Sequence, residues 1–162
     1  MAIIAKASTR EWEPAPEGLH QAVCCDVVDL GEIATDWGIR PMVQIKWQID
    51  YLREDTKPYL VQRRFTNSLH EKAALRHILE SWRGKRFTDE ELQGFDLEQL
   101  IGANGQIQII HKQVADGRIF ANVQAMLPLA KGMDKLKVAD YIRVVDRIAQ
   151  EAMGEDNEES PF

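Results

Sequence analysis

The strongest constraint on the fold is a run of strictly alternating residues from Met42 to Tyr51. Its apolar positions are Val43, Ile45, Trp47, Ile49 and Tyr51, and its polar positions are Gln44, Lys46, Gln48 and Asp50. Successive side chains of a β-strand point to opposite faces of the sheet. The period of two therefore predicts a half-buried strand with Trp47 in the core and an outward face of polar side chains.

Four further segments are rich in β-branched and aromatic residues and predict strands. They are Leu19–Leu30, Tyr59–Thr66, Ile107–Val114 and Arg118–Leu127. We expect turns at Gly31–Arg40 and Arg53–Pro58, and a hairpin turn at Ala115-Asp116-Gly117. Glycine and short polar residues favour the backbone conformations that such turns require.

Helical signals separate the third strand from the fourth. Ser68 and Glu71 have capping-box spacing, apolar residues then recur at helical spacing as far as Trp82, and Gly84 ends the run. A second capping box, Thr88-Asp-Glu-Glu91, predicts a short helix before Gly94, and Asp96–Ile101 predicts one more helical turn. A Lys-rich connector follows Pro128, and Ala139–Met153 predicts a terminal helix.

The resulting order, β-β-β-α-β-β, is that of the OB-fold, a partly open five-stranded barrel that binds single strands and oligosaccharides. The sequence therefore predicts a mostly β protein with some α-helix, although other small α+β domains share this order. We divide the chain into an irregular lead-in (1–17), one domain including the terminal helix (18–150) and a disordered acidic tail (151–162).

Charge is distributed unevenly along the chain. The net charge is −6, from 20 Lys and Arg against 26 Asp and Glu. The tail holds five of the acids and no base, which leaves residues 1–150 with 20 bases and 21 acids. Residues 53–86 alone carry nine bases against four acids. A basic region joined to a separate acidic tail predicts a polyanionic ligand for which the tail competes.

The tail residues Asp156, Glu158, Glu159, Pro161 and Phe162 resemble the C-terminal tip of bacterial single-stranded-DNA-binding proteins and of their phage counterparts. The block Phe65–Phe87 is similar to small phage proteins encoded among recombination and replication genes. Ser160 and Asn157 depart from the bacterial tip, in which a run of Asp leads to an apolar residue before Pro-Phe. The resemblance implies single-stranded-DNA binding and recruitment of replication or recombination proteins through the tail. An acidic tail that only solubilises the chain is the alternative.

Single-strand binding requires cations near phosphates and flat side chains on which bases stack. The candidate DNA-binding residues are Trp37, Arg40, Lys46, Arg64, Lys112, Arg118 and Phe120. Trp37 lies in the first predicted turn, where an exposed indole invites stacking. Phe120 shares an otherwise polar strand face with Asn122 and Gln124. Trp47 and Trp82 follow apolar faces and are assigned to the core, whereas a Trp37 folded back on the barrel is the alternative for that residue.

Enzymatic patterns are weak in this sequence. His70-Glu71 begins like a zinc-protease motif, but Ala74 stands where the second ligand would be. The four histidines and the adjacent Cys24 and Cys25 lack metal or disulfide spacing. We expect no carboxylate in an apolar setting that would raise its pKa. We therefore expect no catalytic residues, metal or cofactor, although an enzyme accessory subunit stays a third alternative.

Location and partners follow from the same composition. No apolar run approaches the ~18 residues of a membrane span, so we expect no membrane partner. The two cysteines form no disulfide framework, which favours a reducing cytoplasm, and the resemblance implies that of a bacterial host. The main alternative function is a protein-interaction adaptor whose barrel binds protein. The sequence leaves a homo-oligomer open.

Overall fold

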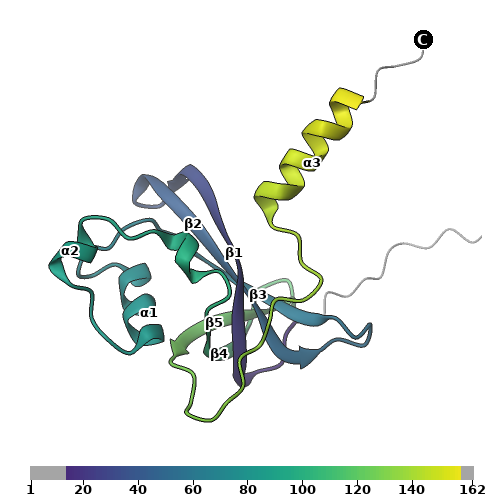
Figure 1. Cartoon of the computed structure of the whole chain (residues 1–162), viewed down its shortest axis with the longest axis horizontal. Coiled ribbons are helices and arrows are strands. Elements are labelled where there is room, and N and C mark those ends of the chain that lie inside the picture. Colours follow the sequence, from purple (N-terminus) through teal and green to yellow (C-terminus); the bar gives the residue numbers. More distant parts are fainter. Residues whose placement is uncertain (1–13, 158–162) are drawn as a thin grey trace, which may run out of the picture.

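Five strands form one antiparallel sheet in the computed structural model, which describes residues 14–157 and the side chains as far as residue 152 (Figure 1). The strands are β1 (Gly18–Thr35), β2 (Gly38–Leu52), β3 (Pro58–Thr66), β4 (Asn104–Gln113) and β5 (Ile119–Leu127). Their spatial order is β3-β2-β1-β4-β5, so β3 and β5 are the edge strands. The predicted mostly β architecture with five strands is confirmed.

The β1–β2 hairpin is longer than the sequence predicted. The expected turn at Gly31–Arg40 is wrong, because only Asp36 and Trp37 separate the two strands. Gly31 has a left-handed φ of 67° at an irregularity in the β1–β2 register, and its N–H donates to the Asp29 carboxylate. A bulge absorbs such a residue without ending the strand.

A second bulge in β1 reverses the face to which Asp26 points. Cys24 lies opposite Trp47, and Asp26 lies opposite Lys46. A step of two residues along β1 therefore matches a step of one residue along β2. Strict alternation would place Asp26 on the core side together with Cys24. The extra residue, Cys25, instead turns Asp26 to the outer face beside Lys46.

The helices are α1 (Ala74–Arg83), α2 (Asp89–Leu92), the 3-10 helix η1 (Leu97–Leu100) and α3 (Val144–Asn157). The predicted cap at Ser68 is wrong: α1 begins six residues later, and the Ser68 hydroxyl accepts the His70 N–H at 3.1 Å within a turn. The capping box of Thr88 and Glu91 is confirmed, as is the left-handed Gly84 at the end of α1.

The core lies between the inner face of the sheet and α1 (Figure 1). The buried face of α1 consists of Leu75, Ile78, Leu79 and Trp82. The rings of Trp47 and Trp82 meet edge to face with centroids 5.9 Å apart. The Trp82 Nε1–H donates to the Asn104 carbonyl oxygen at 2.9 Å. Both tryptophans are buried, as predicted.

Residues 128–143, which we call the strap, run across the outer surface of the sheet toward α3 (Figure 1). Asn104 on β4 accepts the Leu136 N–H at 2.7 Å and donates to the Leu136 carbonyl at 2.9 Å. Gln48 on β2 pairs in the same reciprocal way with the backbone of Ala139. Gln48 thus points outward as predicted, but the strap covers it and it is 5% exposed; Gln44 is also buried, at 8%.

The terminal helix begins and ends later than the sequence predicted. Residues 139–143, predicted to be helical, belong to the strap, and α3 begins at Val144. The helix continues to Asn157, so residues 151–157 of the predicted disordered tail are helical. Residues 1–13 of the lead-in and the tail residues Glu158, Glu159, Pro161 and Phe162 lie outside the described residues.

The close packing around Gly105 leads to a prediction about the stability of the fold. A Cβ at this position would lie 2.7 Å from the Leu127 carbonyl oxygen and 2.8 Å from the Trp82 indole. Gly105→Ala should therefore lower the free energy of unfolding by about 1–3 kcal/mol, the usual cost of overpacking a core. Urea unfolding followed by circular dichroism measures this. Gly94→Ala is the control, because a Cβ at Gly94 meets nothing within 4 Å. Equal stability of wild type and Gly105→Ala would contradict the packing described.

Candidate nucleic-acid interface

The β4–β5 hairpin brings three predicted site residues together. Lys112 lies directly opposite Phe120 in the strand register. The Phe120 side chain is 44% exposed, and the Arg118 guanidinium carbon lies 5.6 Å from its ring centroid. Arg118 also forms an exposed ion pair with Asp116 (Nε to Oδ2, 2.6 Å). An exposed aromatic ring with a cation on each side is suited to a base and its phosphates.

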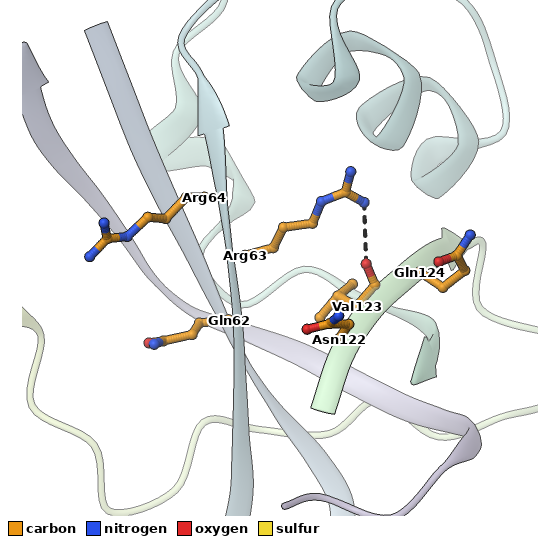
Figure 2. Close-up of a pocket in the computed structure, with 6 residues that line it drawn as sticks. All are labelled: Gln62, Arg63, Arg64, Asn122, Val123 and Gln124. Carbon is orange, nitrogen blue, oxygen red and sulfur yellow. Dashed lines mark hydrogen bonds between the residues drawn. The ribbon is translucent and has the colours of Figure 1, made fainter. Parts of the chain in front are cut away.

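A polar groove of about 430 Å³ lies where the two edge strands face each other. Its lining residues are Gln62, Arg63 and Arg64 from β3 and Asn122, Val123 and Gln124 from β5. Figure 2 shows Gln62 and Arg64 on one side of β3 and Arg63 on the other, reaching toward β5. We call this groove the seam.

Arg63 joins the two sides of the seam. Its Nη1 donates to the Val123 carbonyl oxygen at 3.2 Å, and its guanidinium carbon lies 4.8 Å from the Phe65 ring centroid. Edge strands present backbone N–H and C=O groups that the sheet does not pair. The Arg63 side chain therefore satisfies a β5 carbonyl that faces the other edge.

Arg64 and Phe120 both belong to the outer surface near the seam. Arg64 lines the groove and is exposed. Phe120 precedes Asn122 by two residues on β5, so both side chains point the same way about 7 Å apart along the strand. Lys112, Arg118 and Phe120 therefore gather on the β4–β5 hairpin, and Arg64 lies on β3 at the seam.

Trp37 and Arg40 lie at a different place, the tip of the β1–β2 hairpin. The Trp37 side chain is 84% exposed, which confirms its predicted exposure. Its backbone is held by Thr35 Oγ1, which accepts the Trp37 N–H at 3.2 Å, and by Arg40, whose Nη2 donates to the Trp37 carbonyl at 3.4 Å. Since β4 pairs with the first residues of β1, this tip and the β4–β5 tip lie at opposite ends of the 18-residue β1.

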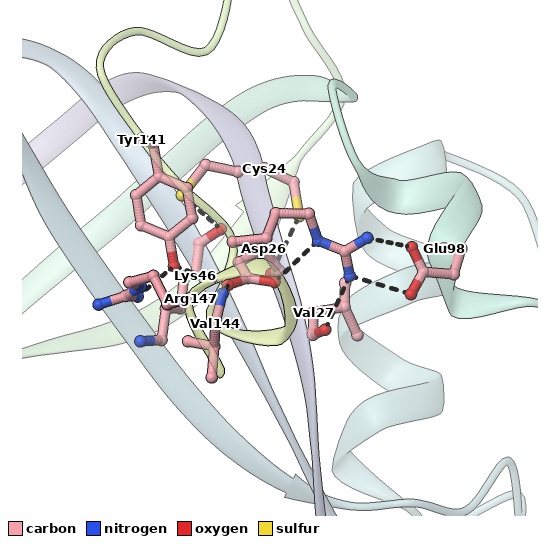
Figure 3. Close-up of polar contacts among 10 residues, drawn as sticks. Cys24, Asp26, Val27, Lys46, Glu98, Tyr141, Val144 and Arg147 are labelled. Carbon is pink, nitrogen blue, oxygen red and sulfur yellow. Dashed lines mark hydrogen bonds and ion pairs between the residues drawn. The ribbon is translucent and has the colours of Figure 1, made fainter. Parts of the chain in front are cut away.

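Lys46 is half-buried rather than fully exposed. It lies opposite Asp26 of β1 on one side and opposite Gln62 of β3 on the other. Figure 3 shows it beside Tyr141 at the end of the strap. Lys46 thus stands at the border between the covered and the open parts of the outer surface.

The sequence analysis missed a buried carboxylate, Asp26. Its side chain is 1% exposed and accepts hydrogen bonds from the Tyr141 hydroxyl (2.7 Å), Arg143 Nε (3.1 Å) and the Val144 N–H (2.9 Å) (Figure 3). Arg143 also pairs with both carboxylate oxygens of Glu98, at 2.7 and 2.9 Å. A lone Asp within the apolar run Ala22–Val28 was the available signal.

Opposing effects set the protonation of this network. Burial alone would raise the pKa of Asp26, but the hydrogen bonds from Val144, Tyr141 and Arg143 outweigh burial and lower it. Burial and the Asp26 carboxylate raise the pKa of Tyr141, so its hydroxyl keeps the proton that it donates. The network is therefore ionic at neutral pH and fastens the strap to β1.

Cys24 and Cys25 are buried thiols, as expected for small core residues. Burial raises the pKa of both, that of Cys25 to about 12. The Cys25 thiol donates to the Lys46 carbonyl oxygen at 3.5 Å. Both side chains are therefore protonated at neutral pH, and neither has the thiolate character of a nucleophile.

Comparison with known proteins gives no relative: the sequence matches no protein-family model and no curated protein at a significant level. Within residues 14–157, no group of three or more metal-ligating side chains gathers. The same part of the chain has no helix with the length and apolar character needed to cross a membrane.

Asp26 generates a prediction on stability and pH. Asp26→Asn should lower the free energy of unfolding at pH 7 by about 3 kcal/mol, because it removes the charge that Arg143 and Tyr141 face. A carboxyl whose pKa is lowered on folding stabilises the protein above its unfolded-state pKa of about 3.9, and the contribution falls as the pH drops through the folded pKa.

The gap between wild type and Asp26→Asn should therefore be widest near pH 7 and narrow at pH 3. Urea unfolding at both pH values measures it, with Asp116→Asn as the control, since Asp116 is an exposed hairpin residue. A gap that stays constant between the two pH values would show that the Asp26 charge does not fasten the strap.

Proposed function

We propose that this protein is a non-enzymatic single-stranded-DNA-binding protein that acts in phage-type replication or recombination. The observation that carries the proposal is the exposed Phe120 flanked by Lys112 and Arg118. The polar lining of the seam, which includes Arg64, and the exposed Trp37 support it. Cations attract the phosphates, and aromatic faces accept bases without regard to sequence.

We assign the fold to the OB class as part of this proposal. Three strands, a helical segment and two further strands follow one another along the chain. The edge strands β3 and β5 then face each other across the seam, which gives a five-stranded, partly open barrel. OB-folds bind oligonucleotides through a strand face and through the β1–β2 and β4–β5 loops. Trp37 and Arg118 belong to these two loops.

The direct test is a titration with fluorescein-labelled oligo(dT) at several salt concentrations. The proposal expects binding whose log K falls linearly with log salt, because cations that contact phosphates release counterions. A double-stranded oligonucleotide of equal length should bind more weakly. If oligo(dT) does not bind at low salt, or if its binding does not weaken as salt is added, the proposal is wrong.

A protein-interaction adaptor is the second candidate function. It is favoured by the exposed apolar residues of α3, Val145 and Ile148, which are 58% and 61% exposed. An adaptor predicts no oligo(dT) binding, so the same titration separates the two functions.

Trp37 generates a binding prediction. Trp37→Ala should weaken oligo(dT) binding by about 1–3 kcal/mol, the usual cost of losing one stacked base. The melting temperature should change little, because the indole is exposed. Fluorescence anisotropy measures the affinity and circular dichroism the melting temperature.

The matched control is Ile39→Ala, which removes a 68% exposed apolar side chain from the same hairpin. Ile39 has no ring on which a base can stack, so its affinity should stay at wild type. Equal losses in the two variants would assign Trp37 no specific role.

The acidic segment generates a separate prediction about partners. We propose that Asp156, Glu158 and Glu159 together with Pro161-Phe162 recruit replication or recombination proteins, as the resemblance implies. Phe162→Ala keeps every charge, so it should abolish recovery of these proteins from host extract while DNA affinity stays at wild type. Ser160→Ala is the control. Recovery of the same proteins by wild type and Phe162→Ala would contradict recruitment through the ring.

A further inference from the structure

The strap closes a large part of the outer surface that the strands would otherwise offer to a ligand. Its reciprocal hydrogen bonds to Asn104 and Gln48 hold it against β4 and β2. The buried Asp26 network fastens its end to β1. The outer faces of β1 and of the adjoining part of β2 are therefore occupied by the chain itself.

The open part of this surface is the seam. Gln62 and Arg64 on β3 and Asn122 and Gln124 on β5 are exposed and line one groove. Two arginines and three amides contribute to the lining, which contains no carboxylate. Such a lining suits an anionic ligand that also carries hydrogen-bonding groups.

The groove is also preformed. The Arg63 guanidinium spans from β3 to the Val123 carbonyl and packs on the Phe65 ring, so the two edges are held at a fixed spacing. A ligand then pays little for ordering the protein when it binds. Phe120 lies next along β5 on the same face as Asn122, which extends the groove toward the β4–β5 hairpin.

From these observations we propose that the seam between β3 and β5 is the track of the DNA single strand, in place of the strap-covered face of β1 and β2. The inference rests on the proposed function and assigns its binding surface. Arg64 and Lys112 contact phosphates at the two ends of the track, and Phe120 stacks with a base. The amides of Gln62, Asn122 and Gln124 donate to or accept from any base edge, so recognition is independent of sequence.

The first experiment compares Arg64→Glu with Arg86→Glu in the oligo(dT) titration. Both variants change the net charge equally, and Arg86 lies on the exposed connection between α1 and α2, away from the seam. Arg64→Glu should weaken binding about tenfold at low salt. It should also make the slope of log K against log salt less steep, by the equivalent of about one phosphate contact. Arg86→Glu should keep the wild-type slope. Equal effects of the two variants, with wild type binding normally, would overturn the track and leave the proposed function intact.

The second experiment locates the strand directly. A photo-crosslinking amino acid is placed at Gln62 in the seam or at Val138, an exposed strap residue, and each protein is irradiated with labelled oligo(dT). The track predicts a crosslink at Gln62 and none at Val138. A crosslink at Val138 alone would place the strand on the strap and overturn the inference. A wild-type protein that fails to bind oligo(dT) would remove the proposed function and the track together.

Discussion

The buried carboxylate of Asp26 determines which surface of the sheet stays open. A buried ionised carboxylate without partners would cost several kcal/mol. Asp26 instead receives three donors, all from residues 141–144, which follow it by more than a hundred positions. The strap is therefore fixed where it satisfies this charge. Removing any one donor leaves the others to hold a charge that water can barely reach.

A local irregularity makes this contact possible. The bulge at Cys25 shifts the phase of β1, so Asp26 faces outward beside Lys46 while Cys24 stays in the core beside Trp47. Without the extra residue, the carboxylate would point to the core side of the sheet, away from the Tyr141, Arg143 and Val144 donors. One inserted residue in one strand therefore turns the carboxylate toward the strap, which covers part of the outer surface of β1, β2 and β4.

Most features that depend on residues close in the sequence were predicted correctly, whereas features that depend on distant residues were not. The burial of Trp47, the capping box at Thr88 and the end of the helix at Gly84 depend on neighbours a few residues away, and the structure confirms each. The bulge at Gly31 looked like a turn, because glycine serves both structures and only the partner strand distinguishes them. Ser68 had a valid capping pattern, but its hydroxyl closes a turn and α1 starts later.

In the candidate site, too, local features were predicted and long-range features were not. The exposure of Trp37 followed from its place in a hairpin turn. The opposition of Lys112 and Phe120 was not predicted, because it depends on the register of the two strands. The burial of Gln48 could not be predicted, because its partner Ala139 lies 91 residues away in a segment without hydrophobic periodicity.

The seam lies between the two edge strands of the sheet, β3 and β5. Each inner strand has a hydrogen-bonded neighbour on both sides, whereas β3 and β5 each have a neighbour on one side. A hydrophobic closure of the two edges would have produced a sealed barrel with no groove. Placing Arg63 there, with amides on either side, keeps the edges together through a cation and leaves room for polar groups between them. Arg63 thus pairs a backbone carbonyl of one edge strand from the other and places a positive charge between the two edges.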